Sequence, residues 1–183
     1  MPDKSKQALR QLYMHDATLL RIKDEQKMSK PKIEDVIGDF LDGEALTNAL
    51  SFIEFLRANK MNPKWSATCS WIVKHKQKNV CVIKLHGSAW QYGVEVGAWY
   101  IECFNLLDIL DEFSSCDELK EILWANVQHC TNCCSCGPGW SSRIVGKQFD
   151  NICRIVIKNP DTKALEYAKK MVEASKEYIA KTI

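Results

Sequence analysis

The sequence of 183 residues has almost no net charge and no long apolar run. Basic residues exceed acidic ones so slightly that the formal net charge is +2. A surface that binds nucleic acid or an anionic membrane is expected to carry a clustered excess of basic side chains, which this balance does not predict. No apolar run approaches the roughly 20 residues that a transmembrane helix needs. We therefore expect no nucleic-acid partner and no membrane span.

The first residues, Met1 to Lys6, lack the features of a secretory signal peptide. They are charged and lead into an amphipathic segment, without an apolar core or a small-residue cleavage site. The protein is therefore expected in the cytoplasm. Nine cysteines in such a reducing compartment are unsuited to a disulfide framework, and their odd number argues the same way.

Motifs that identify common enzyme families are also absent. Gly146-Lys147 lacks the upstream glycine spacing of a phosphate-binding loop, and there is no GxGxxG sequence. Neither the GxSxG motif nor the paired histidines of zinc proteases occur. The sequence thus names no substrate and no reaction, and it leaves open whether the protein is an enzyme.

Hydrophobic periodicity predicts helices at both ends of the chain and strands in the middle. Helical spacing covers residues 5–26, 42–60, 106–113, 116–129 and the segment after Asn159-Pro160. Strand composition covers residues 71–73, 80–85, 90–101 and 152–157. This order predicts an α+β fold, in which an antiparallel sheet of about three to five strands packs against helices, with N-terminal and C-terminal helices.

One domain is expected over residues 1–183, as is usual for this length. Residues 1–32 would form an N-terminal helix that can project, and residues 33–183 the core. Asp42 and Asn159 are expected as N-caps, and Ser115 to Glu118 reads as a capping box. The helix after this box would end near His129, so the cysteines beyond it would follow a helix C-terminus.

The most specialised feature is a cluster of cysteines that ends at Gly137-Pro138-Gly139. Cys130, Cys133 and Cys136 are each separated by two residues, a spacing that lets tight turns direct several sulfurs at one ion. Cys153 follows farther along the chain and completes a set of four thiolates, with Cys134 as an extra residue. The spacing resembles the lobe zinc site of alcohol dehydrogenases, although the rest of the chain does not. A zinc site on Cys130, Cys133, Cys136 and Cys153 is the leading interpretation.

Three other interpretations of the cluster stay open. An iron–sulfur cluster also uses cysteines two residues apart, but in ferredoxins a proline follows the fourth cysteine, whereas Arg154 follows Cys153 here. A metal-free redox pair would use Cys133 with Cys134 or with Cys130. The negative end of a preceding helix would raise the thiol pKa and works against this role. The last alternative is that the cluster has no chemistry.

The neighbouring histidine and the isolated cysteines receive separate interpretations. His129 adjoins Cys130 and is an alternative metal ligand. Free cysteine often acts as a small apolar residue in protein cores. That interpretation applies to the four isolated cysteines, Cys69, Cys81, Cys103 and Cys116.

Aromatic residues crowd the predicted strands. Trp71, Trp90, Tyr92 and Trp99 could line a pocket for an unidentified small ligand, with their polar atoms orienting it. The alternative is that these side chains fill the core between the sheet and the helices, which is the commoner role of buried aromatics.

Several short runs resemble small bacterial cysteine-knuckle proteins of unknown function. They are Asn62-Pro63-Lys64-Trp65, Ser70-Trp71, Val80 to Lys84, the three-cysteine knuckle and Gly146-Lys147-Gln148-Phe149. The resemblance implies no activity and marks only the four cysteine positions named above. We therefore expect a cytoplasmic metal-binding protein with a structural zinc site and a small-ligand pocket. The alternative is a redox or metal-sensing enzyme that uses an iron–sulfur cluster or reactive thiols at the same cysteines.

Overall fold

A computed structural model of the chain describes residues 22–85, 98–104, 109, 116–130 and 139–182. Its helices are α2 (Gly43–Ala58), α4 (Asp117–Ala125) and α5 (Thr162–Thr182), with two 3-10 helices, η1 (Ile33–Asp35) and η2 (Ile37–Asp39). Its strands are β1 (Lys64–Ala67), β2 (Ser70–His75), β3 (Lys78–Leu85), β4 (Trp99–Cys103), β5 (Val127–His129), β6 (Trp140–Ile144), β7 (Lys147–Ile155) and β8 (Ile157–Lys158). The predicted α+β fold is confirmed.

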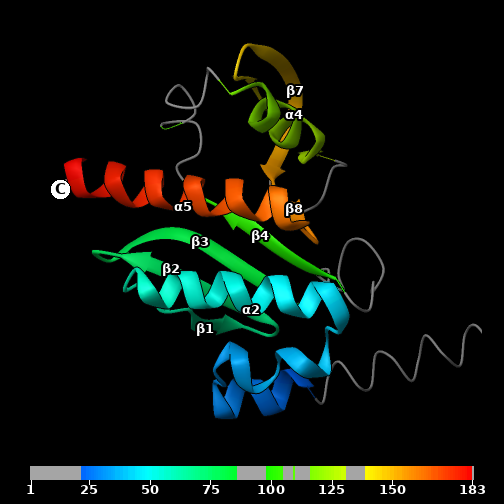
Figure 1. Cartoon of the computed structure of the whole chain (residues 1–183), viewed down its shortest axis with the longest axis vertical. Helices are drawn as coiled ribbons and strands as arrows, with labels where there is room; N and C mark the ends of the chain where they lie inside the picture. The colour runs from blue at the N-terminus through cyan, green and yellow to red at the C-terminus, as the bar shows by residue number, and fades with distance from the viewer. Residues whose placement is uncertain (1–21, 86–97, 105–108, 110–115, 131–138, 183) are drawn as a thin grey trace, which may run out of the picture.

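The strands form two antiparallel sheets (Figure 1). The larger sheet has the order β1-β2-β3-β4-β8, and the smaller sheet has the order β5-β7-β6. The smaller sheet is built from chain that leaves the larger sheet after β4 and returns to it at β8. Because β8 pairs directly with β4, the chain leaves and re-enters the larger sheet at neighbouring strands.

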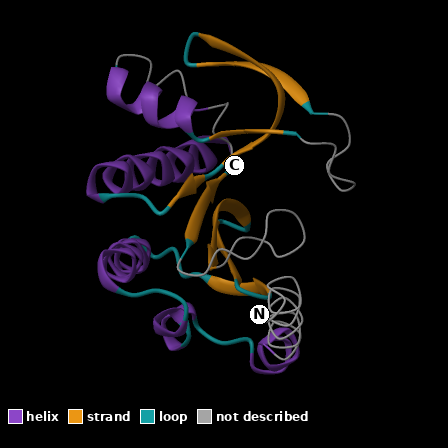
Figure 2. Ribbon diagram, turned by 90° about the vertical axis from the view of Figure 1, so that its right-hand side faces the viewer, coloured by secondary structure: helices purple, strands orange, loops and turns teal. Residues whose placement is uncertain are grey.

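Helices α2 and α5 pack on the same side of the larger sheet (Figure 2). Helix α5 buries one face against its neighbours, with residues at three- and four-residue spacing: Leu165, Ala168, Val172, Ser175 and Ile179. Asn48 of α2 donates a hydrogen bond to the carbonyl oxygen of Pro160 just before α5, at 3.1 Å. This bond fixes the start of one helix against the other.

The start of the chain is anchored to the larger sheet. Residues 22–29 are helical, and Gln26 of this helix is buried. Its side-chain Oε1 accepts a hydrogen bond of 2.7 Å from the backbone N–H of Cys69, between β1 and β2. The described part of the N-terminal helix is therefore docked against the β1–β2 turn.

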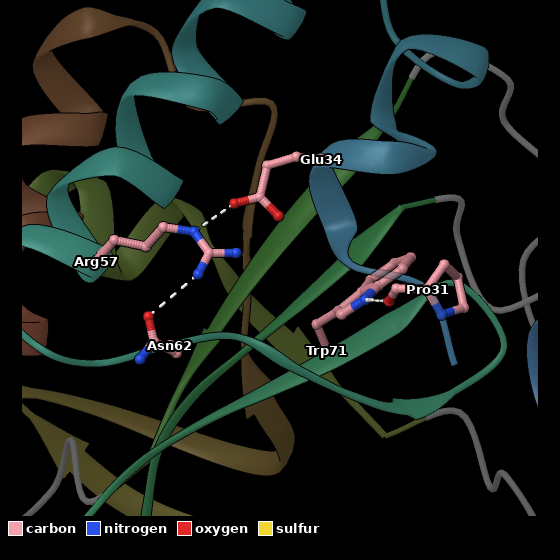
Figure 3. A network of polar contacts seen from close by, with 5 residues as sticks. All are labelled: Pro31, Glu34, Arg57, Asn62 and Trp71. Atoms are coloured by element: carbon pink, nitrogen blue, oxygen red, sulfur yellow. Dashed lines mark hydrogen bonds and ion pairs between the residues drawn. The ribbon is translucent and has the colours of Figure 1, made fainter. Parts of the chain in front are cut away.

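A network of polar contacts joins the segment after this helix to α2 and the sheet (Figure 3). The indole N–H of Trp71 donates to the carbonyl oxygen of Pro31 at 2.9 Å. Arg57 donates from Nε to Glu34 and from Nη1 to Asn62, the latter at 3.1 Å. These contacts hold η1 over the end of α2, where Ile33 is fully buried.

Two predicted helix boundaries are wrong. The helix expected to reach His129 ends at Ala125, because Asn126 caps it and donates from Nδ2 to the carbonyl oxygen of Ile122 at 2.7 Å. The residues that follow form β5, which pairs with β7. The N-cap of α5 is Asp161 instead of Asn159, since its Oδ1 accepts the N–H of Ala164 at 2.7 Å.

Candidate metal centre

The cysteine cluster lies in the connection between β5 and β6 of the smaller sheet. Among the four predicted metal ligands, Cys130 and Cys153 are described. Cys133 and Cys136, like Cys134, lie outside the described residues. The described part of the site is its base, where β5 and β6 pair with β7.

Asn151 of β7 holds the first end of this connection. The backbone N–H of Cys130 donates to the carbonyl oxygen of Asn151 at 2.7 Å. In return, Nδ2 of Asn151 donates to the carbonyl oxygen of Cys130, also at 2.7 Å. Asn151 has a left-handed backbone with φ of +55°, which asparagine adopts more readily than most residues. Cys130 is thus fixed by reciprocal hydrogen bonds and is buried.

The second end of the connection meets the same asparagine. A Cβ atom added at Gly139 would lie 2.3 Å from Oδ1 of Asn151 and 2.8 Å from its carbonyl carbon. Only glycine fits this approach without a shift of the neighbouring backbone. The next residue, Trp140, pairs with Ile152. Cys130 and Gly139, the described residues at the two ends of the connection, therefore meet at one point of β7.

Cys153 stands close to this base. It is two residues beyond Asn151 along β7, a rise of about 7 Å in a strand. The pairing partners Gln128↔Arg154 and His129↔Ile152 leave Cys153 as the extra residue of a β-bulge. Bulges commonly redirect a side chain beside a functional site, and Cys153 is half-buried here. Cys153 therefore lies on β7 two residues from Asn151, the residue that holds Cys130.

His129 ends β5 and directly precedes Cys130. Its Nδ1 is 3.0 Å from the carbonyl oxygen of Asp150, and its ring centroid is 6.5 Å from that of Phe149. A carbonyl oxygen can only accept a hydrogen bond, so this contact places the proton on Nδ1. The remaining nitrogen, Nε2, is then the one that could bind a metal, as expected for a ligand histidine whose other nitrogen donates to a carbonyl.

Within the described residues, no three His, Cys, Asp or Glu side chains gather as a metal site would require. Two of the four predicted ligands lie outside this part of the chain. Comparison with protein-family models, with curated proteins and with solved structures gave no match to this chain.

The aromatic residues predicted to bind a ligand divide into two groups. Trp71 and Trp99 are fully buried in the core. The indole of Trp71 is satisfied by Pro31, and the ring of Trp99 lies 6.1 Å from that of Phe52. These two residues have the core role that was the alternative to a pocket. Trp90 and Tyr92 lie outside the described residues, so their role in a pocket stays a prediction.

A second thiol environment, which the sequence analysis missed, lies at the start of α4. Cys116 was expected as apolar filler, but it is the half-buried N-cap residue of this helix. Its Sγ lies 3.5 Å from the hydroxyl of Tyr167, and that hydroxyl donates to Glu118 at 2.6 Å. Contact with Tyr167 and with backbone N–H groups of the first helical turn lowers the pKa of Cys116. The capping-box sequence from Ser115 to Glu118 includes this residue, but it predicts no role for the thiol.

No described helix is long and apolar enough to span a membrane.

Proposed function

We propose that the protein binds one Zn²⁺ through Cys130, Cys133, Cys136 and Cys153. The ion would cross-link the connection between β5 and β6 to β7. Four thiolates fill the coordination sphere of zinc, so this site is closed and structural, with no position for a substrate. The proposal includes a cytoplasmic location, where these thiols stay reduced in the absence of metal.

One observation supports the proposal above the others: both ends of the cysteine-bearing connection lie on Asn151. The hydrogen bonds to Cys130 and the close approach of Gly139 bring the two ends together through contacts that do not involve a cysteine sulfur. Closing a loop costs entropy, and a base that is already closed reduces the part of this cost that the metal must offset. Cys153, two residues from Asn151 along β7, would supply the fourth thiolate.

Metal content tests the proposal directly. Untagged protein, kept reduced and never exposed to a chelator, should show one zinc per chain by native mass spectrometry. Cys153→Ser should lose the metal, because it removes one of four thiolates. Cys116→Ser removes a thiol outside the site and should retain full occupancy. Wild-type protein with only the apo mass, or Cys153→Ser protein with full zinc, would contradict the proposal.

The alternative is a redox or metal-sensing protein that uses an iron–sulfur cluster or reactive thiols at the same cysteines. One finding favours it: the cluster follows strand β5 and not a helix C-terminus. The negative end of a helix, which would raise the thiol pKa, is therefore not adjacent to Cys130. Protein purified without oxygen separates the two functions. Visible absorbance with acid-labile sulfide would identify an iron–sulfur cluster, and colourless protein with zinc would identify the structural site.

The small ligand would bind to residues outside the described part of the chain. Trp90 and Tyr92 would supply its aromatic contacts, since Trp71 and Trp99 are occupied in the core.

A further inference from the structure

Two cysteines outside the cluster, Cys81 and Cys103, lie directly opposite each other in the larger sheet. They are partners in the antiparallel register of β3 and β4. Directly opposite residues of two antiparallel strands point to the same face of the sheet. Both thiols are free in this structure.

The backbone hydrogen bonds show which kind of pair this is. The N–H of Phe104 donates to the carbonyl oxygen of Val80 at 2.8 Å, which makes the neighbouring pair a hydrogen-bonded one. The two kinds of pair alternate along an antiparallel ladder, so Cys81 and Cys103 form a non-hydrogen-bonded pair. The bond from the N–H of Leu85 to the carbonyl oxygen of Cys69, at 2.9 Å, agrees. This bond shows that the backbone N–H of Leu85 points toward β2. The N–H and carbonyl groups of alternate β3 residues, including Cys81, therefore point toward β2 as well.

This geometry is compatible with a disulfide. In a non-hydrogen-bonded pair the two Cα atoms are about 4.5 Å apart, which lies within the range of about 4.4 to 6.8 Å found for disulfides. In hydrogen-bonded pairs the Cα atoms are about 1 Å farther apart and the side chains are less close. The two sulfurs can therefore reach bonding distance through side-chain rotation and a small strand adjustment.

The two cysteine residues differ in how much of their surface is exposed. Cys81 is fully buried against the helices, whereas Cys103 is half-buried near the end of β4. Ser175 of α5 covers this end, and its hydroxyl donates to the carbonyl oxygen of Phe104 at 3.3 Å. Because Cys103 is the less buried residue, we expect a small oxidant to react with Cys103 first and Cys81 to react second.

We propose that Cys81 and Cys103 form a reversible cross-strand disulfide with a low-molecular-weight disulfide as oxidant. The Cys103 thiolate attacks the oxidant, forms a mixed disulfide and releases one small thiol. The sulfur of Cys81, after losing its proton to solvent, attacks the Cys103 sulfur and expels the second small thiol. The two protein thiols are oxidised by two electrons, and the oxidant is reduced to two thiols.

Burial slows both the formation and the reduction of this disulfide. It raises the pKa of Cys103 to about 12 and that of Cys81 well above the usual range of a thiol. Little thiolate is present at neutral pH, so the bond forms slowly in the native protein. A thiol with a high pKa is also a poor leaving group, so the bond is slow to reduce once formed.

The experiment forms the bond under conditions in which both thiols are accessible. Reduced full-length protein is unfolded and then refolded in a buffer of oxidised and reduced glutathione, with zinc present. After alkylation of free thiols, a non-reducing tryptic digest should contain residues 79–84 linked to residues 85–120. Because the second peptide also carries Cys116, the digest uses the Cys116→Ser protein. Separate refolding of Cys81→Ala and Cys103→Ala proteins in this background should abolish the linked peptide.

Stability gives a second readout. The disulfide should raise the thermal midpoint by roughly 6 to 12 °C relative to the same protein after reduction, because it removes chain entropy from the unfolded state. In the Cys81→Ala protein the midpoint should not respond to reduction. Refolded protein that carries no linked peptide, or that links Cys81 mainly to another cysteine, would overturn the proposal.

Discussion

Asn159 and Trp99 hold each other through two hydrogen bonds. The backbone N–H of Asn159 donates to the carbonyl oxygen of Trp99 at 2.9 Å, and the N–H of Trp99 donates to Oδ1 of Asn159 at 2.8 Å. Asn159 ends β8 with a left-handed backbone, φ +40°, and Trp99 begins β4 in the core. The side chain of Asn159 therefore continues the pairing of β4 and β8 by one residue after the strand itself has turned away.

Replacing Asn159 with alanine should lower the free energy of unfolding by about 2 to 3 kcal/mol. The substitution removes the acceptor of the Trp99 N–H and leaves a residue that disfavours the left-handed backbone. Urea denaturation measures the difference. Asn159→Gly also lacks the acceptor but accepts a positive φ, so it should lose less stability than alanine. Equal losses for the two variants would mean that the backbone conformation contributes nothing.

Replacing Gly139 with alanine should weaken zinc binding by about tenfold or more, as loss of supporting contacts around a metal site commonly does. The added Cβ would lie within 2.8 Å of the Asn151 carbonyl carbon and would force the base of the cysteine connection open. Competition with a chromophoric chelator measures the affinity. Gly38→Ala is the matched control, since a Cβ there meets nothing within 4 Å. Unchanged zinc affinity in Gly139→Ala would show that zinc binding does not depend on the close approach of Gly139 to Asn151.

Cys116 should be alkylated faster than Cys69, Cys81 or Cys103. Its pKa is lowered by the neighbouring Tyr167 hydroxyl, whereas burial raises that of Cys69 to about 11. A lower pKa gives more thiolate at neutral pH, and the thiolate is the species that reacts. Limited reaction with iodoacetamide at pH 7.5, followed by fragmentation of the tryptic peptides, ranks the rates.

The cause of this reactivity can be tested at the tyrosine. Tyr167→Phe removes the hydroxyl and should slow alkylation of Cys116 by roughly three- to tenfold. Tyr178→Phe removes a hydroxyl elsewhere on α5 and should leave the rate unchanged. If both variants react like the wild type, the start of the helix alone lowers the pKa.

The contact between Glu34 and Arg57 should make stability depend on pH. Burial raises the pKa of Glu34, but the hydrogen bond and charge of Arg57 outweigh it, so the pKa lies below its usual value. A carboxyl group with a depressed pKa stabilises the fold above the pKa of the unfolded chain. This contribution disappears as the pH falls through the lower pKa of the folded state.

Urea denaturation of wild-type and Glu34→Gln proteins at several pH values measures this contribution. The wild type should be more stable by about 0.5 to 1 kcal/mol between pH 6 and 8, with a difference that shrinks below about pH 4.5. Asp117→Asn is the control, because Asp117 pairs with Lys120 while 89% exposed, and it should change stability little at any pH. A wild-type advantage that persists undiminished at pH 3.5 would assign the contribution to packing instead of charge.

Local sequence patterns predicted several of the helices and strands correctly. Strands β2 and β3 were expected from their composition, and Lys76 and Gln77 form the turn between them with left-handed backbones. Helix α2 begins after Asp42, and helix α5 follows Asn159-Pro160, both as expected. Each of these features depends on residues that are close together in the sequence.

Features that depend on contacts between distant segments could not be predicted from the sequence. Val127 to His129 continue a helical pattern but are drawn into β5 by pairing with β7. The role of Asn151 depends on Cys130 and Gly139 arriving from another segment. Cys81 faces Cys103 because of the register between strands that are separated by a long connection, and no local periodicity encodes that register.

The return of the chain at β8 has a consequence for the speed of folding. Tyr100 can pair with Lys158 only after residues 101–157 have been drawn into a closed loop, and such long-range pairing slows folding. Once β5, β6 and β7 have folded, the loop contains far fewer freely rotating bonds, so its closure loses less entropy. An ion that cross-links the cysteine connection early would therefore accelerate the pairing of β4 with β8, although it binds outside the larger sheet.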